Sequence, residues 1–133
     1  MKIVNYLILI VALAITMIAC SKSSNDDPPT TSNSINGVWQ GTLVTESSKI
    51  TSFYAFDIKP NGVLHRLNEA GSIAGTGIWS IDNNIFTGTY KTESNTKYSV
   101  IGTYNKSINK ILGNWGLNNS VTNGGTWEMI KKQ

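Results

Sequence analysis

Cysteine and histidine occur once each among the 133 residues of the chain. The first scarcity excludes an intrachain disulfide, and the second argues against catalysis by a Ser-His-Asp triad. Because Cys20 has no second cysteine, no disulfide can form within the chain. Because His65 is the only histidine, a Ser-His-Asp triad would depend on it, and no serine nucleophile motif accompanies it. We therefore interpret His65 as a structural or surface residue and expect the protein not to be an enzyme.

Charge is scarce as well, at 14% of the residues, and lysine and arginine form no run. Without a basic patch the sequence predicts no nucleic-acid partner. The carboxylates are scattered, with no spacing that indicates a glycosidase pair or a metal site. Asp82-Asn83-Asn84 matches the start of a calcium loop for three residues only, which favours a tight turn. We expect no metal and no cofactor.

No apolar run is long enough to span a membrane as a helix. The longest, Leu7–Ala19, is broken only by Thr16 and falls short of the ~20 residues needed. Following Lys2, it is typical of a secretory signal, here residues 1–19. Met17-Ile18-Ala19-Cys20 resembles the cleavage motif of bacterial lipoproteins, which implies that Cys20 becomes an acylated N-terminus anchored in the membrane. An ordinary signal peptide and an uncleaved anchor are the alternatives.

Residues 21–34 contain no apolar side chain and are rich in Ser, Asn, Asp, Pro and Thr. Such a segment cannot bury surface, so we expect residues 20–35 to be a disordered tether after the acylated cysteine. Asp26-Asp27 resembles the surface-export signals of some Gram-negative lipoproteins, and a solvated linker is the alternative. These features predict an outer-membrane lipoprotein of the bacterial cell envelope, on either the periplasmic or the surface side.

What the chain does have is a repeated Gly-x-Trp motif, which accounts for every tryptophan. The four copies are Gly37-Val38-Trp39, Gly77-Ile78-Trp79, Gly113-Asn114-Trp115 and Gly125-Thr126-Trp127. Gly88-Thr89-Tyr90 and Gly102-Thr103-Tyr104 repeat the spacing with tyrosine. In a strand, residues two apart share a face. Glycine on that face lets the sheet coil sharply and leaves space for a ring from a neighbouring strand. The motif predicts a small barrel filled with aromatic rings.

Period-two alternation predicts eight short strands. We place them at 37–44, 51–58, 62–67, 74–81, 84–91, 97–104, 110–117 and 124–131. The third strand fits least well, and we expect Val63, His65 and Leu67 to face inward there, although Leu64 competes. The predicted fold is all-β: an eight-stranded antiparallel up-and-down β-barrel over residues 36–133.

The predicted connections alternate in length. Those at 59–61, 82–83 and 105–109 are mostly short, and those at 45–50, 68–73, 92–96 and 118–123 average longer. In an up-and-down barrel alternate connections lie at opposite ends. We therefore expect one end closed by short turns, with both chain ends nearby, and the other end ringed by longer loops.

Eight strands that open on Gly37-x-Trp39 resemble the calycin superfamily of lipocalins, fatty-acid-binding proteins and avidins. In lipocalins the ring of such a tryptophan plugs the closed end beneath a basic residue of the last strand. The resemblance implies that Trp39 is this plug and that Lys131 or Lys132 supplies the cation. The chain is similar to small lipocalin-like lipoproteins of Gram-negative bacteria, but its folded region is shorter than that of typical lipocalins.

Strand direction divides the aromatic residues into two groups. Trp39, Trp79 and Tyr104, with Lys131, are predicted to form a structural plug at the short-turn end. A binding site for a small apolar or amphipathic ligand would be lined by Tyr54, Phe56, Tyr90 and Trp115. Otherwise these rings only fill the core. The alternative is a solid-cored envelope module that binds a protein or glycan through the loop-rim residues Glu46, Lys49, Asn68, Glu69, Glu93, Asn118 and Asn119.

Overall fold

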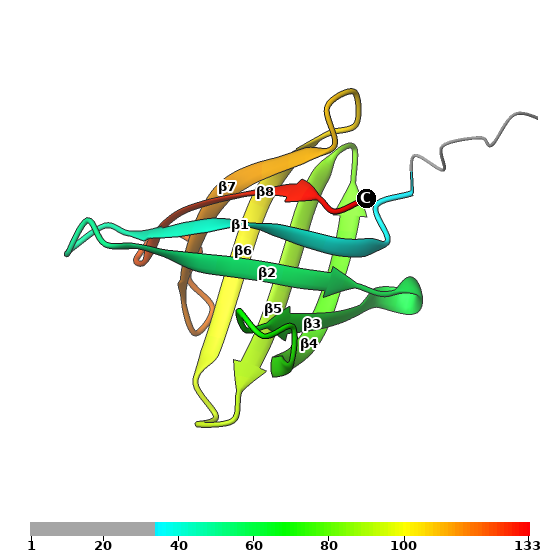
Figure 1. The fold of residues 1–133 in the computed structure, drawn as a ribbon. Coiled ribbons are helices and arrows are strands. Elements are labelled where there is room, and N and C mark those ends of the chain that lie inside the picture. Colours follow the sequence, from blue (N-terminus) through cyan, green and yellow to red (C-terminus); the bar gives the residue numbers. More distant parts are fainter. Residues whose placement is uncertain (1–33) are drawn as a thin grey trace, which may run out of the picture. The chain divides into compact units, whose positions relative to one another are not determined.

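The computed structural model describes residues 34–133. They form β1 (Gly37–Thr45), β2 (Thr51–Ile58), a 3₁₀ turn (Pro60–Gly62), β3 (Val63–Leu67), β4 (Ile73–Asp82), β5 (Ile85–Thr92), β6 (Lys97–Asn105), β7 (Lys110–Leu117) and β8 (Gly125–Lys131) (Figure 1). The signal peptide, Cys20 and most of the tether lie outside this range, and what the sequence predicts about them stays a prediction. Within residues 34–133, no helix has the length and apolar character needed to cross a membrane.

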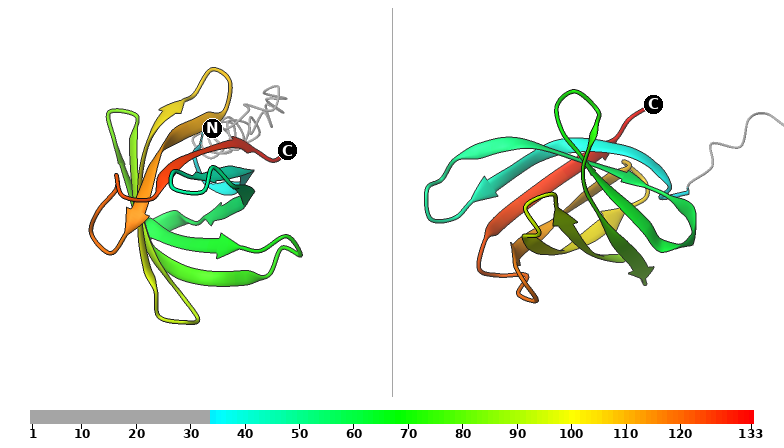
Figure 2. Two further views of the ribbon diagram at one scale, coloured as in Figure 1. Left: turned by 90° about the vertical axis from the view of Figure 1, so that its left-hand side faces the viewer. Right: turned by 90° about the horizontal axis from the view of Figure 1, so that it is seen from below.

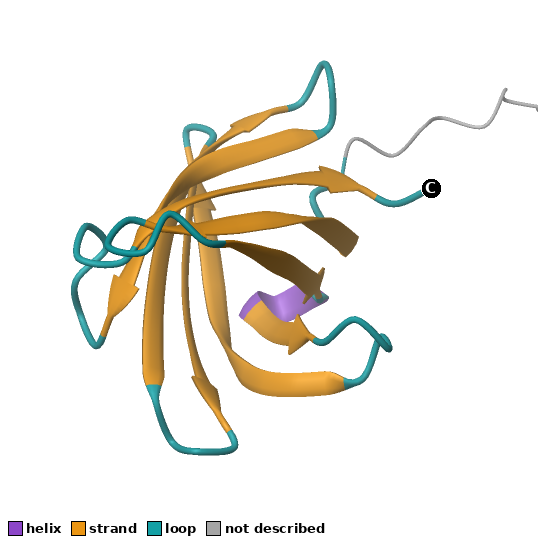
Figure 3. Cartoon of the chain, turned by 60° about the vertical axis from the view of Figure 1, so that its left-hand side comes forward, coloured by secondary structure: helices purple, strands orange, loops and turns teal. Residues whose placement is uncertain are grey.

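The sheet closes on itself. Consecutive strands pair antiparallel, and β1 also pairs with β8, so the strands run around a closed barrel in chain order. Figure 2 shows the barrel from two further sides. Figure 3 shows that strands and loops make up nearly all of it, with one short helical turn. The predicted all-β, eight-stranded, up-and-down fold is confirmed, with every strand boundary within one residue of its predicted position.

The connections separate the barrel into two ends. The turns at 59–62, 83–84 and 106–109 lie at one end, which we call the closed end, where β1 begins and β8 finishes (Figure 1). The loops at 46–50, 68–72, 93–96 and 118–124 surround the other end, which we call the mouth. Asn83 and Asn84 both have positive φ, 46° and 68°, as a two-residue hairpin turn requires. The Asp82-Asn83-Asn84 segment is therefore the predicted tight turn.

Glycines on the inner face do the two jobs that the repeated motif predicts. A Cβ on Gly77 would lie 1.8 Å from the carbonyl oxygen of Thr89, so only glycine lets β4 and β5 approach this closely. A Cβ on Gly102 would lie 2.8 Å from the indole ring of Trp127, which fills the space that the glycine leaves. Sharp coiling and ring packing thus come from the same residues.

Aromatic rings from most of the strands fill the interior. The most deeply buried large side chains are Trp39, Tyr54, Phe56, Ile58, Leu64, Phe86, Val100, Ile111 and Met129. Trp127 lies at their centre, with its ring 6.0 Å from the rings of both Phe56 and Phe86. The core also includes Ile35, just before the first strand. Since the sheet closes through its own strands around this core, residues 34–133 hold the contacts needed to fold by themselves.

The predicted inner face of β3 is wrong. Leu64 is fully buried and Val63 is 40% exposed, so Leu64 and Arg66, rather than Val63 and His65, face the interior. The reason is space: the Leu64 side chain sits against Gly88, which has no side chain to oppose it. Leu67 is nevertheless buried, as expected, because a register shift between Arg66 and Leu67 breaks the strict alternation.

Candidate functional site

The predicted plug residues gather at the closed end. Trp39 is fully buried, donates its indole N–H to the carbonyl of Ile35 at 2.7 Å, and meets the ring of Tyr104 edge-on at 5.6 Å. Lys131 does not form the cation–π contact that the resemblance implies. Its ammonium donates to the carbonyl of Ser34 at 2.6 Å, and both cation–π contacts within residues 34–133 belong to Arg66.

Trp79 closes the same end from the side of β4. Its ring stacks on Phe86 with centroids 6.1 Å apart, and its indole N–H donates to the carbonyl of Lys59 at 2.8 Å. Tryptophan places an apolar ring inside and needs a partner for one N–H. Here a main-chain carbonyl of the β2–β3 turn supplies that partner, so the indole N–H of Trp79 is hydrogen-bonded at the closed end.

The four predicted ligand residues lie near one another, but they are not equivalent. Tyr54 and Tyr90 join through their hydroxyls, 3.0 Å apart, below the mouth. Trp115 stands at the edge, where its indole N–H donates to the carbonyl of Val44 at 3.1 Å. Phe56 is fully buried between the other rings and does not line an open surface. Tyr54, Tyr90 and Trp115 line the opening at the mouth, Tyr54 with only 1% of its surface exposed, and Phe56 lies beneath them.

A cleft of about 320 Å³ opens at the mouth, which we call the mouth cleft. Its lining residues are Leu43, Thr45, Ser52, Phe53, Tyr54, Arg66, Ala74, Tyr90, Thr92, Tyr98 and Trp115. Tyr98 and Tyr90 stack at 5.1 Å with their planes only 11° apart, and Trp115 lies 6.0 Å from Tyr98. One wall of the cleft is thus a row of three rings.

Arg66 is the functional candidate that the sequence patterns did not identify. Its guanidinium lies 4.6 Å from the centre of the Tyr54 ring and 5.9 Å from that of Phe53. Its Nη2 donates to the carbonyl of Phe53 at 3.0 Å, and its Nη1 donates to the carbonyls of Leu67 and Ala55. One signal was available: Arg66 is the only arginine in a chain with ten lysines.

Burial keeps the two central phenols of the mouth cleft neutral. It raises the pKa of Tyr54 well above the ordinary tyrosine value of 10.0, and it also raises the pKa of Tyr90. The positive charge of Arg66 acts in the opposite direction on both groups without cancelling the effect of burial. At neutral pH both groups therefore keep their proton, one donates to the other, and one O–H remains for a further acceptor. Neither offsets the charge of Arg66.

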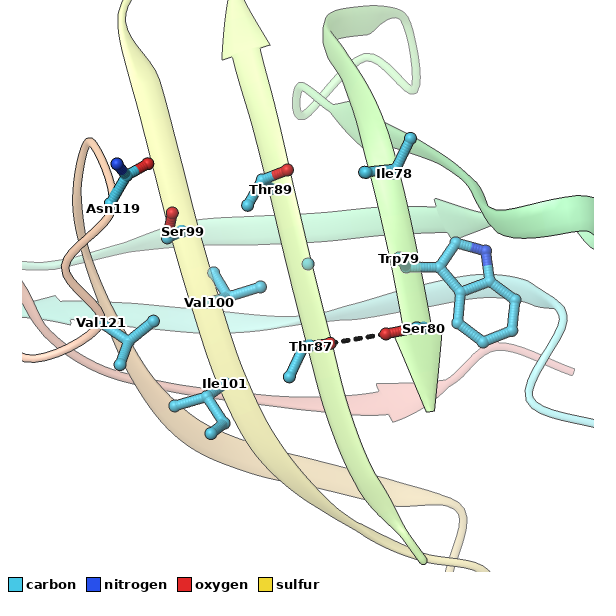
Figure 4. A pocket seen from close by; sticks show the side chains of 11 residues that line it. Ile78, Trp79, Ser80, Thr87, Thr89, Ser99, Val100, Ile101, Asn119 and Val121 are labelled. Carbon is cyan, nitrogen blue, oxygen red and sulfur yellow. Dashed lines mark hydrogen bonds between the residues drawn. The ribbon is translucent and has the colours of Figure 1, made fainter. Parts of the chain in front are cut away.

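A second hollow of about 330 Å³ lies outside the barrel, over β4, β5 and β6 (Figure 4). It is lined by Ile78, Trp79, Ser80, Thr87, Gly88, Thr89, Ser99, Val100, Ile101, Asn119 and Val121, none of which is titratable. The β7–β8 loop covers one side of it. That loop also buries Ser99, which alternation places on the outer face, and Ser99 donates to the carbonyl of Asn118. We call this hollow the outer groove.

Carboxylates of the described residues form ion pairs with lysines. Asp57 pairs with Lys59 at 2.8 Å, and Glu128 pairs with Lys110 at 2.7 Å. Residues 34–133 contain no group of three His, Cys, Asp or Glu side chains that could hold a metal ion. The polar chemistry inside this part of the barrel therefore concentrates in Arg66 and the tyrosines of the mouth cleft.

No protein-family model matches this chain, and no curated protein or solved structure shows a significant match to it. The structure is compatible with a lipocalin-like fold in two features described above. One is the closed, antiparallel, up-and-down order of the eight strands. The other is the position of Trp39 on the first strand at the closed end.

Proposed function

We propose that this protein is a lipocalin-like binding protein that takes a small amphipathic ligand into the mouth cleft. The observation that carries the proposal is the cleft itself, whose volume of about 320 Å³ reaches the ~300 Å³ at which ligand sites begin. A wall of three aromatic rings suits the apolar part of a ligand. The hydroxyls of Tyr54 and Tyr90 and the guanidinium of Arg66 suit a polar part.

We also propose that Cys20 is acylated and anchors the protein in the outer membrane. The apolar run before Cys20 supports this, as does the entry of the chain into the barrel at the closed end, opposite the mouth. Labelled palmitate fed to the native cells should be incorporated into the wild type and lost in Cys20→Ser. Incorporation that survives the substitution would rule out this anchor.

The ligand can be sought by native mass spectrometry of the full-length protein isolated from its own cells. We expect a bound small molecule that leaves on mild collisional activation. Ala74→Trp, which fills the mouth cleft, should abolish the bound mass because the new ring occupies the lining.

Thr76→Trp is the matched control. Thr76 lies on the same strand and is exposed outside the cleft, so the same ring added there should leave the bound mass in place. A protein that carries no small molecule, together with an Ala74→Trp variant that binds amphipathic probes as the wild type does, would refute the proposed function.

A second candidate function is the binding of a protein or glycan at the loop rim. The outer groove favours it, because Asn119 of the rim borders a surface rich in serine and threonine hydroxyls (Figure 4). Cross-linking in intact envelopes should then capture a partner from the wild type and lose it in Asn119→Trp. Equal capture by both proteins would exclude this groove as the contact.

A further inference from the structure

We propose that the ligand of the mouth cleft carries an oxyanion, a carboxylate, sulfonate or phosphate group, and that Arg66 binds it. This inference rests on the proposed function and goes one step beyond it, from a site for amphipathic molecules to a site that selects by charge. It is carried by the position of one cation, by the neutral partners that hold it, and by the fact that no ion pair among residues 34–133 includes it.

The first observation is that neutral groups hold Arg66 in place. Three of its hydrogen bonds go to the main-chain carbonyls of Phe53, Ala55 and Leu67. Its guanidinium also interacts with the neutral hydroxyl of Tyr90 and lies over the Tyr54 ring, 4.6 Å from its centre. A guanidinium has five N–H donors in a fixed plane. These neutral partners therefore fix its orientation and leave at least one N–H for a further partner.

The second observation is that the positive charge of Arg66 is not balanced. Within residues 34–133 the ion pairs join Lys49 to Glu46, Lys59 to Asp57 and Lys110 to Glu128, and none includes Arg66. Carbonyl dipoles and ring faces attract the guanidinium but carry no net charge. A half-buried cation without a counter-ion is costly, so an entering anion gains more there than in water.

The third observation is that the surrounding hydroxyls favour an anion as well. The hydroxyls of Tyr54 and Tyr90 are neutral and lie 3.0 Å apart, so one donates to the other and one O–H remains free to donate. The hydroxyl of Tyr90 also interacts with the guanidinium. An oxyanion on Arg66 would accept charge-assisted hydrogen bonds, which are shorter and stronger than neutral ones. The stacked rings of Tyr90 and Tyr98, with Trp115 beside them, then cover the apolar remainder of the ligand.

Two fluorescent probes separate charge from shape: anilinonaphthalene sulfonate and N-phenylnaphthylamine, which share their rings and differ by the sulfonate. Each is titrated into residues 21–133. We expect the sulfonate to bind roughly tenfold to hundredfold more tightly, the range for a hydrogen bond to a charged group. In Arg66→Gln the two affinities should become equal within about twofold, with the neutral probe unaffected.

Two further variants control for charge and for folding. Lys91→Gln removes an exposed charge outside the cleft and should leave both affinities unchanged. Arg66→Lys keeps the charge but loses the planar fork, so it should retain part of the preference. If circular dichroism shows that Arg66→Gln does not fold, the wild-type preference, its decrease with added salt, and Arg66→Lys decide the question.

The outcomes distinguish this inference from the proposed function. Equal binding of both probes by the wild type, blocked by Ala74→Trp, would overturn the oxyanion proposal and leave the binding function standing. Binding of neither probe, or binding that Ala74→Trp does not affect, would remove the proposed function itself. A sulfonate preference that survives in Arg66→Gln would assign the charge selectivity to another residue and would also overturn the inference.

Discussion

The two ends of the barrel use the same kinds of residue to opposite effect. At the closed end the indole N–H groups of Trp39 and Trp79 are covered by main chain from outside the strands, at Ile35 and Lys59. At the mouth Tyr54 and Tyr90 bond to each other, and the loops leave a cleft above them. The comparison shows that main chain outside the strands satisfies the ring N–H groups at the closed end, whereas the phenols at the mouth line a cleft and depend on each other.

The polar groups differ between the ends in the same way. Lys131 at the closed end donates to the carbonyl of Ser34, where the chain enters the barrel. Arg66 at the mouth is also held by carbonyls, but it lines an open cleft and has no carboxylate partner among the described residues. One cation completes the packing of a chain end, and the other faces solvent and any ligand.

The largest effect is expected from Trp39→Ala. Deleting this fully buried ring should lower the free energy of unfolding by about 3–5 kcal/mol, because the surrounding turns cannot collapse into the space. Urea unfolding of residues 21–133 measures the loss. Trp115→Ala at the mouth should cost less, since that ring borders an opening. An equal or larger loss for Trp115→Ala would contradict the contrast between the two ends.

An intermediate effect is expected at alkaline pH. Because burial raises the folded-state pKa of Tyr54 and Tyr90, their contribution to stability is complete below pH 10.0 and is lost as the pH rises toward the folded-state pKa. In that range each phenol should lower the free energy of unfolding by about 1.4 kcal/mol per pH unit. Tyr104 at the closed end has a raised pKa from burial and acts in the same sense.

Tyr54→Phe tests the contribution of the mouth. Urea unfolding measured at several pH values above 10 gives the slope of the unfolding free energy against pH. In the variant this slope should be smaller than in the wild type by the contribution of one phenol. At neutral pH the variant should lose about 0.5–1.5 kcal/mol, the value of one hydrogen bond. An alkaline slope identical to that of the wild type would show that Tyr54 ionises as easily in the folded protein as in the unfolded chain.

The smallest effect is expected at the loop rim. Lys49 and Glu46 form an ion pair whose side chains are both about 70% exposed. Solvent screens such pairs, so Lys49→Gln should change the free energy of unfolding by less than about 0.5 kcal/mol. Thermal unfolding at low and high salt checks this. A larger loss would mean that the rim loops help to hold the mouth in shape.

Most of the fold could be predicted because the residue pattern within each strand indicates which side chains face inward. Alternation fixes the face of Trp39 and Tyr104, and the asparagines at 83 and 84 supply the positive φ values that a tight hairpin needs. The third strand could not be assigned in the same way. Val63 and Leu64 are both apolar, so local pattern does not choose between them, and the choice depends on the space over Gly88.

The candidate site was only partly predictable for a related reason. Tyr54, Tyr90 and Trp115 follow from inward alternation. Arg66 does not, because a charged residue beside a buried leucine looks like an outward residue until the strand is placed. The burial of Ser99 under the β7–β8 loop likewise depends on a contact between segments distant in the chain.

By itself the sequence determined that residues 36–133 form eight strands that curl into a barrel lined with rings, because period-two alternation and glycine spacing are local properties. Only the tertiary structure decided that Arg66 lines the mouth cleft and that Phe56 lies beneath the cleft instead of lining it. The physical reason is that burial and charge balance depend on which segments meet, and in a closed barrel each strand's surroundings come from neighbours that its own residues do not encode.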